Sequence, residues 1–333
     1  MTQLRDLKIS TLDLVPVRAD AGPAQSLRNS LDLAQHVERF GYNRFWVAEH
    51  HNMDGIASSA TSVLIGYLAG GTSSIRVGSG GVMLPNHAPL VIAEQFGTLA
   101  SLYPGRIDLG LGRAPSSDQM TAYALRRDRA GGPDDFPDDV EELSRYLGPR
   151  TDDQKVIAVP GHDTEVPMWL LGSSLFSAQL AGMRGMPYAF ASHFAPRFLH
   201  QAIGLYRQLF RPSAVLDKPY VMVGVPVVAA PTDAEAQFLA TSTQQRVLGI
   251  LTGQRGKLPL PVEGFLQQLG PREQAAIQDF LALAVVGGPE TVRQGFAQIQ
   301  QSTEADELIL VTDIHDPALR LRSLEISAQA LAG

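Results

Sequence analysis

Residues 75–114 read IRVGSGGVMLPNHAPLVIAEQFGTLASLYPGRIDLGLGRA. Residues 75–84 and 106–114 are short apolar runs, which are typical of buried strands. Residues 88–105 have a helical pattern that ends in a proline and a glycine. A strand, a helix and a second strand joined by short loops predict a parallel βαβ unit.

The same alternation continues on both sides of this stretch. Six further apolar runs are each followed by a helical pattern, at residues 8–17, 44–51, 167–174, 187–194, 220–230 and 307–314. Eight strands that alternate with helices over a chain of this length predict an α/β fold. The expected architecture is a single (β/α)8, or TIM, barrel domain over residues 1–333.

Two segments are too long to be ordinary barrel loops. One covers about residues 115–166 after the fourth strand, and the other covers about residues 252–286 after the seventh. Residues 154–167, within the first, could add a small hairpin. Because segments that follow the C-terminal ends of barrel strands lie on the catalytic face, we expect both insertions to wall or cover the active site.

Composition excludes several classes of function. The formal net charge is -7, whereas a nucleic-acid-binding protein needs a basic face. The chain has no cysteine, which excludes disulfides, thiolate metal sites and cysteine nucleophiles. An apolar run of about 18 residues, as a membrane span requires, is missing. The N-terminal stretch does not resemble a signal peptide, so we expect a cytoplasmic protein.

The second expected strand ends in four polar residues, Glu49, His50, His51 and Asn52. If the strand persists that far, Glu49 and His51 share one face and His50 takes the other. Adjacent histidines therefore seldom bind one metal ion together, and neither HxH nor HExxH spacing occurs among the 8 histidines. The pattern predicts no metal site, and leaves acid–base chemistry and a purely structural histidine as alternatives.

Other strand ends offer groups that bind anions. The fifth strand ends in Gly172, Ser173 and Ser174, and Ser177 follows on the next helix. Free N–H groups at the start of a helix favour phosphate, and Arg113 could clamp the same group. The alternative is a serine N-cap with a surface arginine, and the residues alone leave both open. A second candidate, Gly287 and Gly288, is better explained as a plain helix start.

The glycine pair Gly80–Gly81 lies inside an apolar strand, where glycine reduces stability. It predicts either a β-bulge or a flat ligand that lies against bare backbone. His193, which follows the sixth strand, is a further polar group at a strand end.

The chain resembles a known family, the bacterial luciferase-like flavin monooxygenases, over nearly its whole length. The stretches that carry the resemblance are residues 44–52, 77–113, 170–194 and 285–292. The resemblance implies a barrel that binds FMN at the C-terminal ends of its strands. It places His50 at the active-site histidine, Gly80–Gly81 at a non-prolyl cis peptide beside the flavin ring, and the phosphate at Arg113, Ser173, Ser174 and Ser177.

The implied reaction uses reduced FMN and O2 to place one oxygen atom in a small organic substrate. A separate NAD(P)H-dependent flavin reductase would supply the reduced cofactor. His50 would act as general base or acid, while Glu49, Asn52 and His193 would shape the pocket or orient it. Luciferase has a cysteine at the position of Gly112, so light emission is not implied.

The resemblance also implies a mobile lid at residues 252–275 and a homodimer through helices 58–72 and 88–102. Two other functions stay open at this point. One is an F420-dependent or FMN-dependent oxidoreductase that transfers hydride, and the other is a non-catalytic flavin-binding protein. The substrate is expected to depend on the variable insertions, so the sequence does not identify it.

Overall fold

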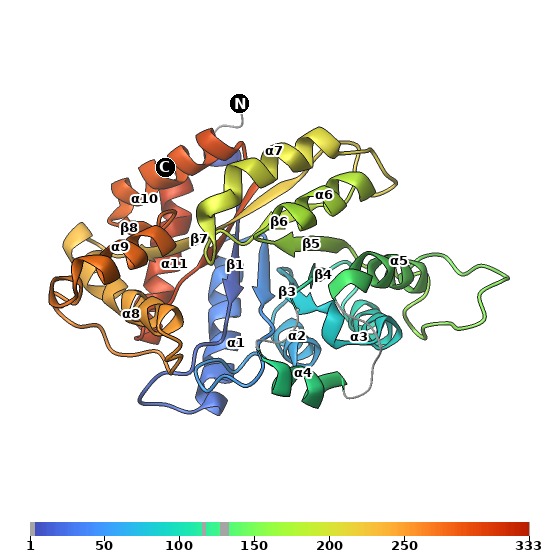
Figure 1. Ribbon diagram of the computed structural model, residues 1–333, viewed down its shortest axis with the longest axis horizontal. Coiled ribbons are helices and arrows are strands. Elements are labelled where there is room, and N and C mark those ends of the chain that lie inside the picture. Colours follow the sequence, from blue (N-terminus) through green and yellow to red (C-terminus); the bar gives the residue numbers. More distant parts are fainter. Residues whose placement is uncertain (1–3, 115–117, 127–132, 333) are drawn as a thin grey trace.

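Eight parallel strands close into a barrel in the computed structural model, which describes residues 4–114, 118–126 and 133–332. Figure 1 shows the strands gathered at the centre with helices around them. The order around the barrel follows the sequence, and β9 closes it by pairing with both β7 and β1. The strands are β1 Lys8–Asp13, β2 Arg44–Val47, β3 Arg76–Met83, β4 Ile107–Gly112, β5 Met168–Gly172, β6 Tyr188–Phe190, β7 Val221–Ala229 and β9 Glu307–Val311. The predicted (β/α)8 fold is confirmed.

Helices cover the outside of the barrel. They are α1 Pro23–Arg39, α2 Thr61–Gly70, α3 Pro89–Leu102, α6 Leu175–Arg184, α7 Leu199–Leu209, α8 Asp233–Leu251, α10 Pro289–Thr303 and α11 Pro317–Ala332. Several begin with proline, whose fixed φ and missing N–H suit the first turn. The 3-10 helices η1 Leu4–Asp6, η2 Leu84–Asn86 and η4 Pro196–Phe198 lie in the connections. None of the described helices is long and apolar enough to cross a membrane.

The first insertion, after β4, contains α4 Gln119–Arg126, η3 Pro133–Asp135 and α5 Phe136–Leu147, and α5 packs against α3. The hairpin expected at residues 154–167 is wrong. This segment forms turns, and the N–H groups of Asp163 and Glu165 donate to the carbonyls of Gly148 and Leu147 at the end of α5. Both residues have positive φ, so the chain bends where a strand would have to stay extended.

The second insertion, after β7, contains η5 Leu266–Gln268, α9 Pro271–Phe280 and a short strand, β8 Val285–Gly287. β8 pairs in parallel with the last residues of β7 and with no other described strand. The sequence prediction missed this strand, because it interpreted residues 287–289 only as a helix start. Both predicted insertion points, after β4 and after β7, are confirmed.

Alternate residues of the strands face two different cores. One set packs outward against the helices, and the other fills the barrel interior. The interior set is Leu12, Trp46, Ala48, Trp169, Ala189, Met222, Ile309 and Val311.

Below that interior set, buried charges occupy the N-terminal ends of the strands. The Arg44 guanidinium lies 2.7 Å from a carboxylate oxygen of Asp108 and 2.9 Å from one of Glu307. These ions close the end of the barrel that faces away from the predicted site.

Candidate active site

A cavity of about 1350 Å³ lies at the C-terminal ends of the strands. Pockets for one drug-sized ligand usually measure about 300–1,000 Å³, so this cavity has room for more than one molecule. All the site residues predicted from the sequence lie on its wall: Glu49, His50, Asn52, Gly80, Gly81, Arg113, Gly172, Ser173, Ser174, Ser177 and His193.

His50 stands just beyond the end of β2. The strand ends at Val47, earlier than predicted, and the His50 N–H donates to the carbonyl of Ser58 at 2.9 Å. Burial, together with the nearby charges of Arg246 and Arg255, lowers the pKa of His50 to about 4. The imidazole is therefore neutral at pH 7 and can accept a proton or a hydrogen bond from the cavity.

His193 follows β6 and lies near His50. Burial, together with the His50 charge, lowers the pKa of His193 to about 4, although Asp313 acts in the opposite direction. Its Nδ1 atom is buried and has no hydrogen-bond partner among the described residues. Gly224 of β7 makes room for the ring, because a Cβ at this position would lie 2.4 Å from Nδ1.

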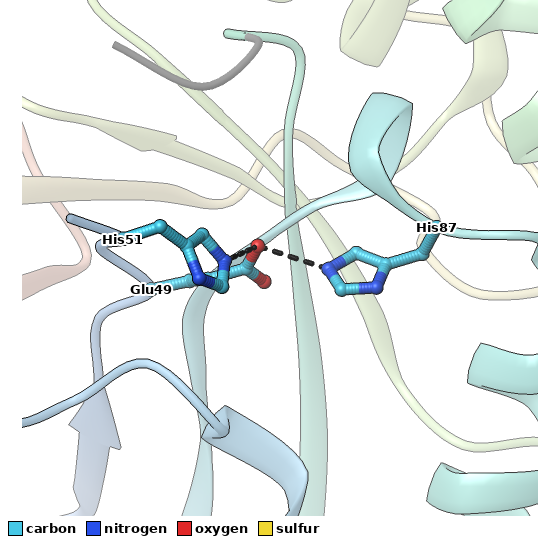
Figure 2. Close-up of side chains that lie close together, drawn as sticks. All are labelled: Glu49, His51 and His87. Atoms are coloured by element: carbon cyan, nitrogen blue, oxygen red, sulfur yellow. Dashed lines mark hydrogen bonds and ion pairs between the residues drawn. The ribbon is translucent and has the colours of Figure 1, made fainter. Parts of the chain in front are cut away.

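Glu49 binds two histidines, neither of which is His50. Its Oε1 atom lies 2.9 Å from Nε2 of His51 and 2.9 Å from Nε2 of His87, and Figure 2 shows the two rings on opposite sides of the carboxylate. The Met83 N–H donates to Oε2 at 3.2 Å. Burial alone would raise the pKa of Glu49, but the two histidines hold it at about 2. Glu49 thus orients the second histidine of the pair, not the first.

Glu49 and His51 do lie together, although β2 ends at Val47 and the alternation on which the prediction relied does not reach them. The sequence prediction missed His87. This residue follows η2, just after β3 ends. A polar side chain directly beyond a strand end is the signal that would have found it. Asn52 is exposed and adopts a left-handed backbone with φ 54°, a conformation that asparagine tolerates better than most residues.

The N-terminus of α6 forms a polar corner of the cavity. Ser174 is the N-cap of this helix, and its side chain makes no capping hydrogen bond. Gly172 allows the turn to close, since a Cβ there would lie 2.5 Å from Oγ of Ser177. The Arg113 guanidinium stacks 4.2 Å from the Phe176 ring centre, and no acidic side chain among the described residues pairs with it. Free helix N–H groups, hydroxyls and an unpaired arginine together suit a phosphate.

The glycine pair of β3 gives the cavity a wall of bare backbone. The Gly80–Gly81 peptide is cis, as the resemblance implied, and the β3–β4 register shifts between Ser79 and Val82, which confirms the predicted bulge. A Cβ on Gly80 would lie 2.7 Å from the Leu12 side chain. A side chain larger than hydrogen therefore does not fit here without rearrangement of the barrel interior.

The second insertion covers the cavity from the side of β1 and β2. Gly253, Arg255 and Gly256 line the cavity. Leu258 is fixed to the segment after β1, because its N–H donates to Val17 at 2.8 Å and its carbonyl accepts from Ala19 at 2.9 Å. Both insertions wall the cavity, as expected, although the first contributes only Asp118 among the described residues.

The second anion candidate is already occupied. The Gly288 N–H, at the start of α10, donates to the Asp233 carboxylate at 2.6 Å. A carboxylate of the protein itself therefore holds the group that an anion would need, which favours a plain helix start.

The fold and the site define a barrel protein that can hold a phosphate-bearing, flat ligand beside two histidines. The chain belongs to the luciferase-like monooxygenase family, whose model matches residues 7–306. It is 53% identical to the uncharacterized protein YvbT of Bacillus subtilis (strain 168), over 98% of this chain and 97% of the relative. It is 52% identical to a luciferase-like monooxygenase of Escherichia coli (strain K12), over 97% of this chain and 96% of the relative.

Solved structures share the same fold. Apo-MsnO8 has a TM-score of 0.89 and 38% identity, over 97% of this chain and 98% of that chain. Two more distant structures show the likeness of fold alone. The oxygenating constituent of 3,6-diketocamphane monooxygenase from Pseudomonas putida, in complex with FMN, has a TM-score of 0.76 and 18% identity, over 98% of both chains. An F420-dependent secondary alcohol dehydrogenase has a TM-score of 0.70 and 15% identity, over 98% of this chain and 99% of that chain.

Proposed function

We propose that this protein uses reduced FMN and O2 to oxygenate a small organic substrate. The observation that carries the proposal is the combination, in one cavity, of Arg113, which has no acidic partner in the part of the chain that the structure describes, near the N-terminus of α6, and the bare backbone of Gly80–Gly81. The first suits the phosphate of FMN, and the second suits its flat ring. Bound reduced FMN would supply two electrons to O2, so that one oxygen atom enters the substrate and the other leaves as water.

The protein's own residues have three tasks in this proposal. Arg113, Ser173, Ser174 and Ser177 hold the phosphate, with Gly172 allowing their close approach. His50 takes or returns a proton at the reacting group, with His193 beside it and Asn52 at the rim. The segment around Leu258 keeps water out of the cavity, which protects reactive oxygen chemistry from the solvent.

Isotope labelling tests the reaction. The protein would be incubated with FMN, NAD(P)H, a flavin reductase and ¹⁸O2, together with a panel of small sulfides, ketones and amines. Mass spectrometry should find a product that carries one ¹⁸O atom. A product formed by hydride transfer, without ¹⁸O and with F420 bound more tightly than FMN, would support the alternative oxidoreductase. Tight FMN binding with neither reaction would indicate a flavin-binding protein.

His50→Ala tests the assigned proton-transfer residue. Because a positioned acid or base contributes about 10²–10⁴-fold to rate, the turnover number should fall by about that factor while FMN affinity changes little. His200→Ala, at an exposed position on α7, is the matched control. Unchanged product formation in the His50 variant would remove it from this role.

A further inference from the structure

We propose that Glu49, His51 and His87 form a binding site for a divalent transition-metal ion such as Zn²⁺. Glu49 and His51 come from the segment after β2, and His87 comes from the segment after β3. Two imidazoles and one carboxylate are a common protein ligand set of zinc in sites that keep a further position open.

The distances are close to those that a metal ion requires. The three ligand atoms all lie within 4.8 Å of one another, and both Nε2 atoms lie 2.9 Å from the same Glu49 oxygen. A tetrahedral ion at about 2.0–2.1 Å from each ligand places the ligand atoms about 3.3 Å apart. To admit the ion, each Nε2 atom would move about 0.4 Å away from the Glu49 oxygen, and the two Nε2 atoms, which lie within 4.8 Å of each other, would approach to about 3.3 Å; rotation of these half-buried side chains would supply both movements.

The surroundings support a bound cation. The Glu49 side chain is only 2% exposed and is held in place by the Met83 N–H on its second oxygen. The carboxylate supplies a negative charge, and no lysine or arginine forms an ion pair with it among the described residues. Figure 2 shows the two rings on opposite sides of the Glu49 carboxylate, each with one nitrogen directed at the same oxygen. Glu49 and His51 line the cavity, so a further coordination position would open toward it.

A metal ion here would link the segments after β2 and β3. The first of these carries His50, so an occupied site would hold the proposed catalytic loop to the strand that carries Gly80–Gly81. Without metal, two hydrogen bonds from imidazole N–H groups satisfy the same carboxylate, and this is the competing explanation of the geometry.

Titration calorimetry with ZnCl2 distinguishes the two explanations. The full chain, without a histidine tag and treated with a chelator, should bind one equivalent of Zn²⁺ and show a higher Tm when zinc is present. Glu49→Gln and His87→Gln should each weaken binding by more than about 100-fold, since changes in supporting residues alone cost about 10–100-fold.

Two decoy variants control for histidines that merely lie beside an acid. His36 lies 3.4 Å from Asp32, and His162 lies 2.7 Å from Asp163, but neither pair has a third ligand among the described residues. His36→Gln and His162→Gln should leave the zinc affinity unchanged. Circular dichroism of every variant would verify folding, and the visible spectrum of the Co²⁺ form of the unaltered protein would report nitrogen and oxygen ligands even if a variant failed to fold.

Either of two results would overturn the site. One is the absence of saturable Zn²⁺ or Co²⁺ binding by the unaltered protein. The other is one-equivalent binding that survives in folded Glu49→Gln and His87→Gln. Because the readout is metal binding, neither result depends on whether the protein oxygenates a substrate.

Discussion

Arg113 is the residue on which the proposed phosphate site depends most. Its guanidinium stacks on Phe176 and has no acidic partner among the described residues, so a bound anion would be its charge partner there. Charge-assisted hydrogen bonds contribute about 1.5–3 kcal/mol. Arg113→Ala should therefore weaken FMN binding by about 10–100-fold while riboflavin, which lacks the phosphate, changes little.

Quenching of flavin fluorescence measures both affinities of the Arg113 variant. Arg322→Ala, on the exposed ion pair with Glu325 in α11, is the matched control and should affect neither flavin. Equal losses for FMN and riboflavin would mean that Arg113 contacts the ring system or supports the fold.

His193 should make the folded state sensitive to acid. Its pKa in the folded protein is about 4, below the ordinary value of 6.5. As pH falls from about 6.5 to about 4, the unfolded state takes up a proton before the folded state does, so the free energy of unfolding falls. The loss for one such histidine is about 3 kcal/mol at most. Above about pH 6.5, His193 is neutral in both the folded and the unfolded state, so its full contribution to the free energy of unfolding is present.

Urea unfolding at about pH 7.5 and about pH 5 measures this loss. His193→Gln should show a smaller drop in stability than the unaltered protein, whereas His200→Gln, at an exposed position, should show the full drop. His193 lies near His50 and near the ion pair of Asp313 with Arg246. Because His50 also has a lowered pKa, part of the fall in the free energy of unfolding should persist in the His193 variant. An unchanged drop would show that His193 does not titrate in this range.

Local rules explain which site residues the sequence could reveal. The contact of Glu49 with His51 could be anticipated because the two residues are close in sequence, although β2 ends at Val47 before either of them. The meeting of Glu49 with His87, or of His50 with His193, depends on how separate strands lie around the barrel. Those contacts depend on how the closed sheet arranges its strands, so they cannot be predicted from the sequence of any single strand.

At the scale of elements, the segment after α8 is held at one buried residue. Leu258 is 1% exposed and bonds through its backbone to Val17 and Ala19. Leu258→Ala should loosen this attachment, since truncating a buried leucine costs about 2–5 kcal/mol. Trypsin should then cut after Arg255 and Lys257, both exposed, at least about tenfold faster.

Mass spectrometry of timed digests locates these cuts. Leu260→Ala is a close control, because Leu260 lies in the same segment but is 61% exposed. Equal cleavage rates in both variants would show that Leu258 does not anchor the segment.

The elements that the sequence misjudged are those with little local pattern. The strand β8 has three residues and forms only because it can pair with the end of β7. Residues 154–167 were expected to add a small hairpin, but the N–H groups of Asp163 and Glu165 found acceptors at the end of α5. By contrast, a proline and a glycine marked the end of the helical pattern at residues 88–105, and α3 Pro89–Leu102 lies within that predicted range.

At the scale of the whole molecule, we propose that the protein is a homodimer that associates through α2 and α3. Val63, which is 73% exposed, and Tyr67 lie one turn apart on α2, and Val91 of α3 is also exposed. The two helices pack against each other, so these side chains gather on one side of the barrel. Apolar groups that face water in this way are typical of an interface.

Sedimentation velocity tests the association. The double variant Val63→Glu and Tyr67→Glu should shift the protein toward a monomer, because burying two unpaired carboxylates in an interface is unfavourable. Val215→Glu, at a position that is 63% exposed outside this face, should leave the dimer intact. A monomeric unaltered protein, or a dimer that tolerates the double variant, would contradict the proposal.

The barrel itself could be predicted because every strand repeats the same pattern, and eight repeats leave few arrangements. The buried ions of Arg44, Asp108 and Glu307 could not, since each lies on a different strand and they meet only when the sheet closes. Taken singly, each residue resembles an ordinary polar end of a strand.

The buried ion pairs of Arg44 determine from which end a ligand can enter the barrel. Arg44 and its two carboxylates occupy the N-terminal end of the barrel axis, so a molecule reaches the interior along that axis only from the opposite end. When two molecules share a space that is reached from one side, the inner one must arrive first and leave last. Steady-state kinetics of such a protein should show a compulsory order of binding, with the molecule nearer the barrel interior as the first to bind.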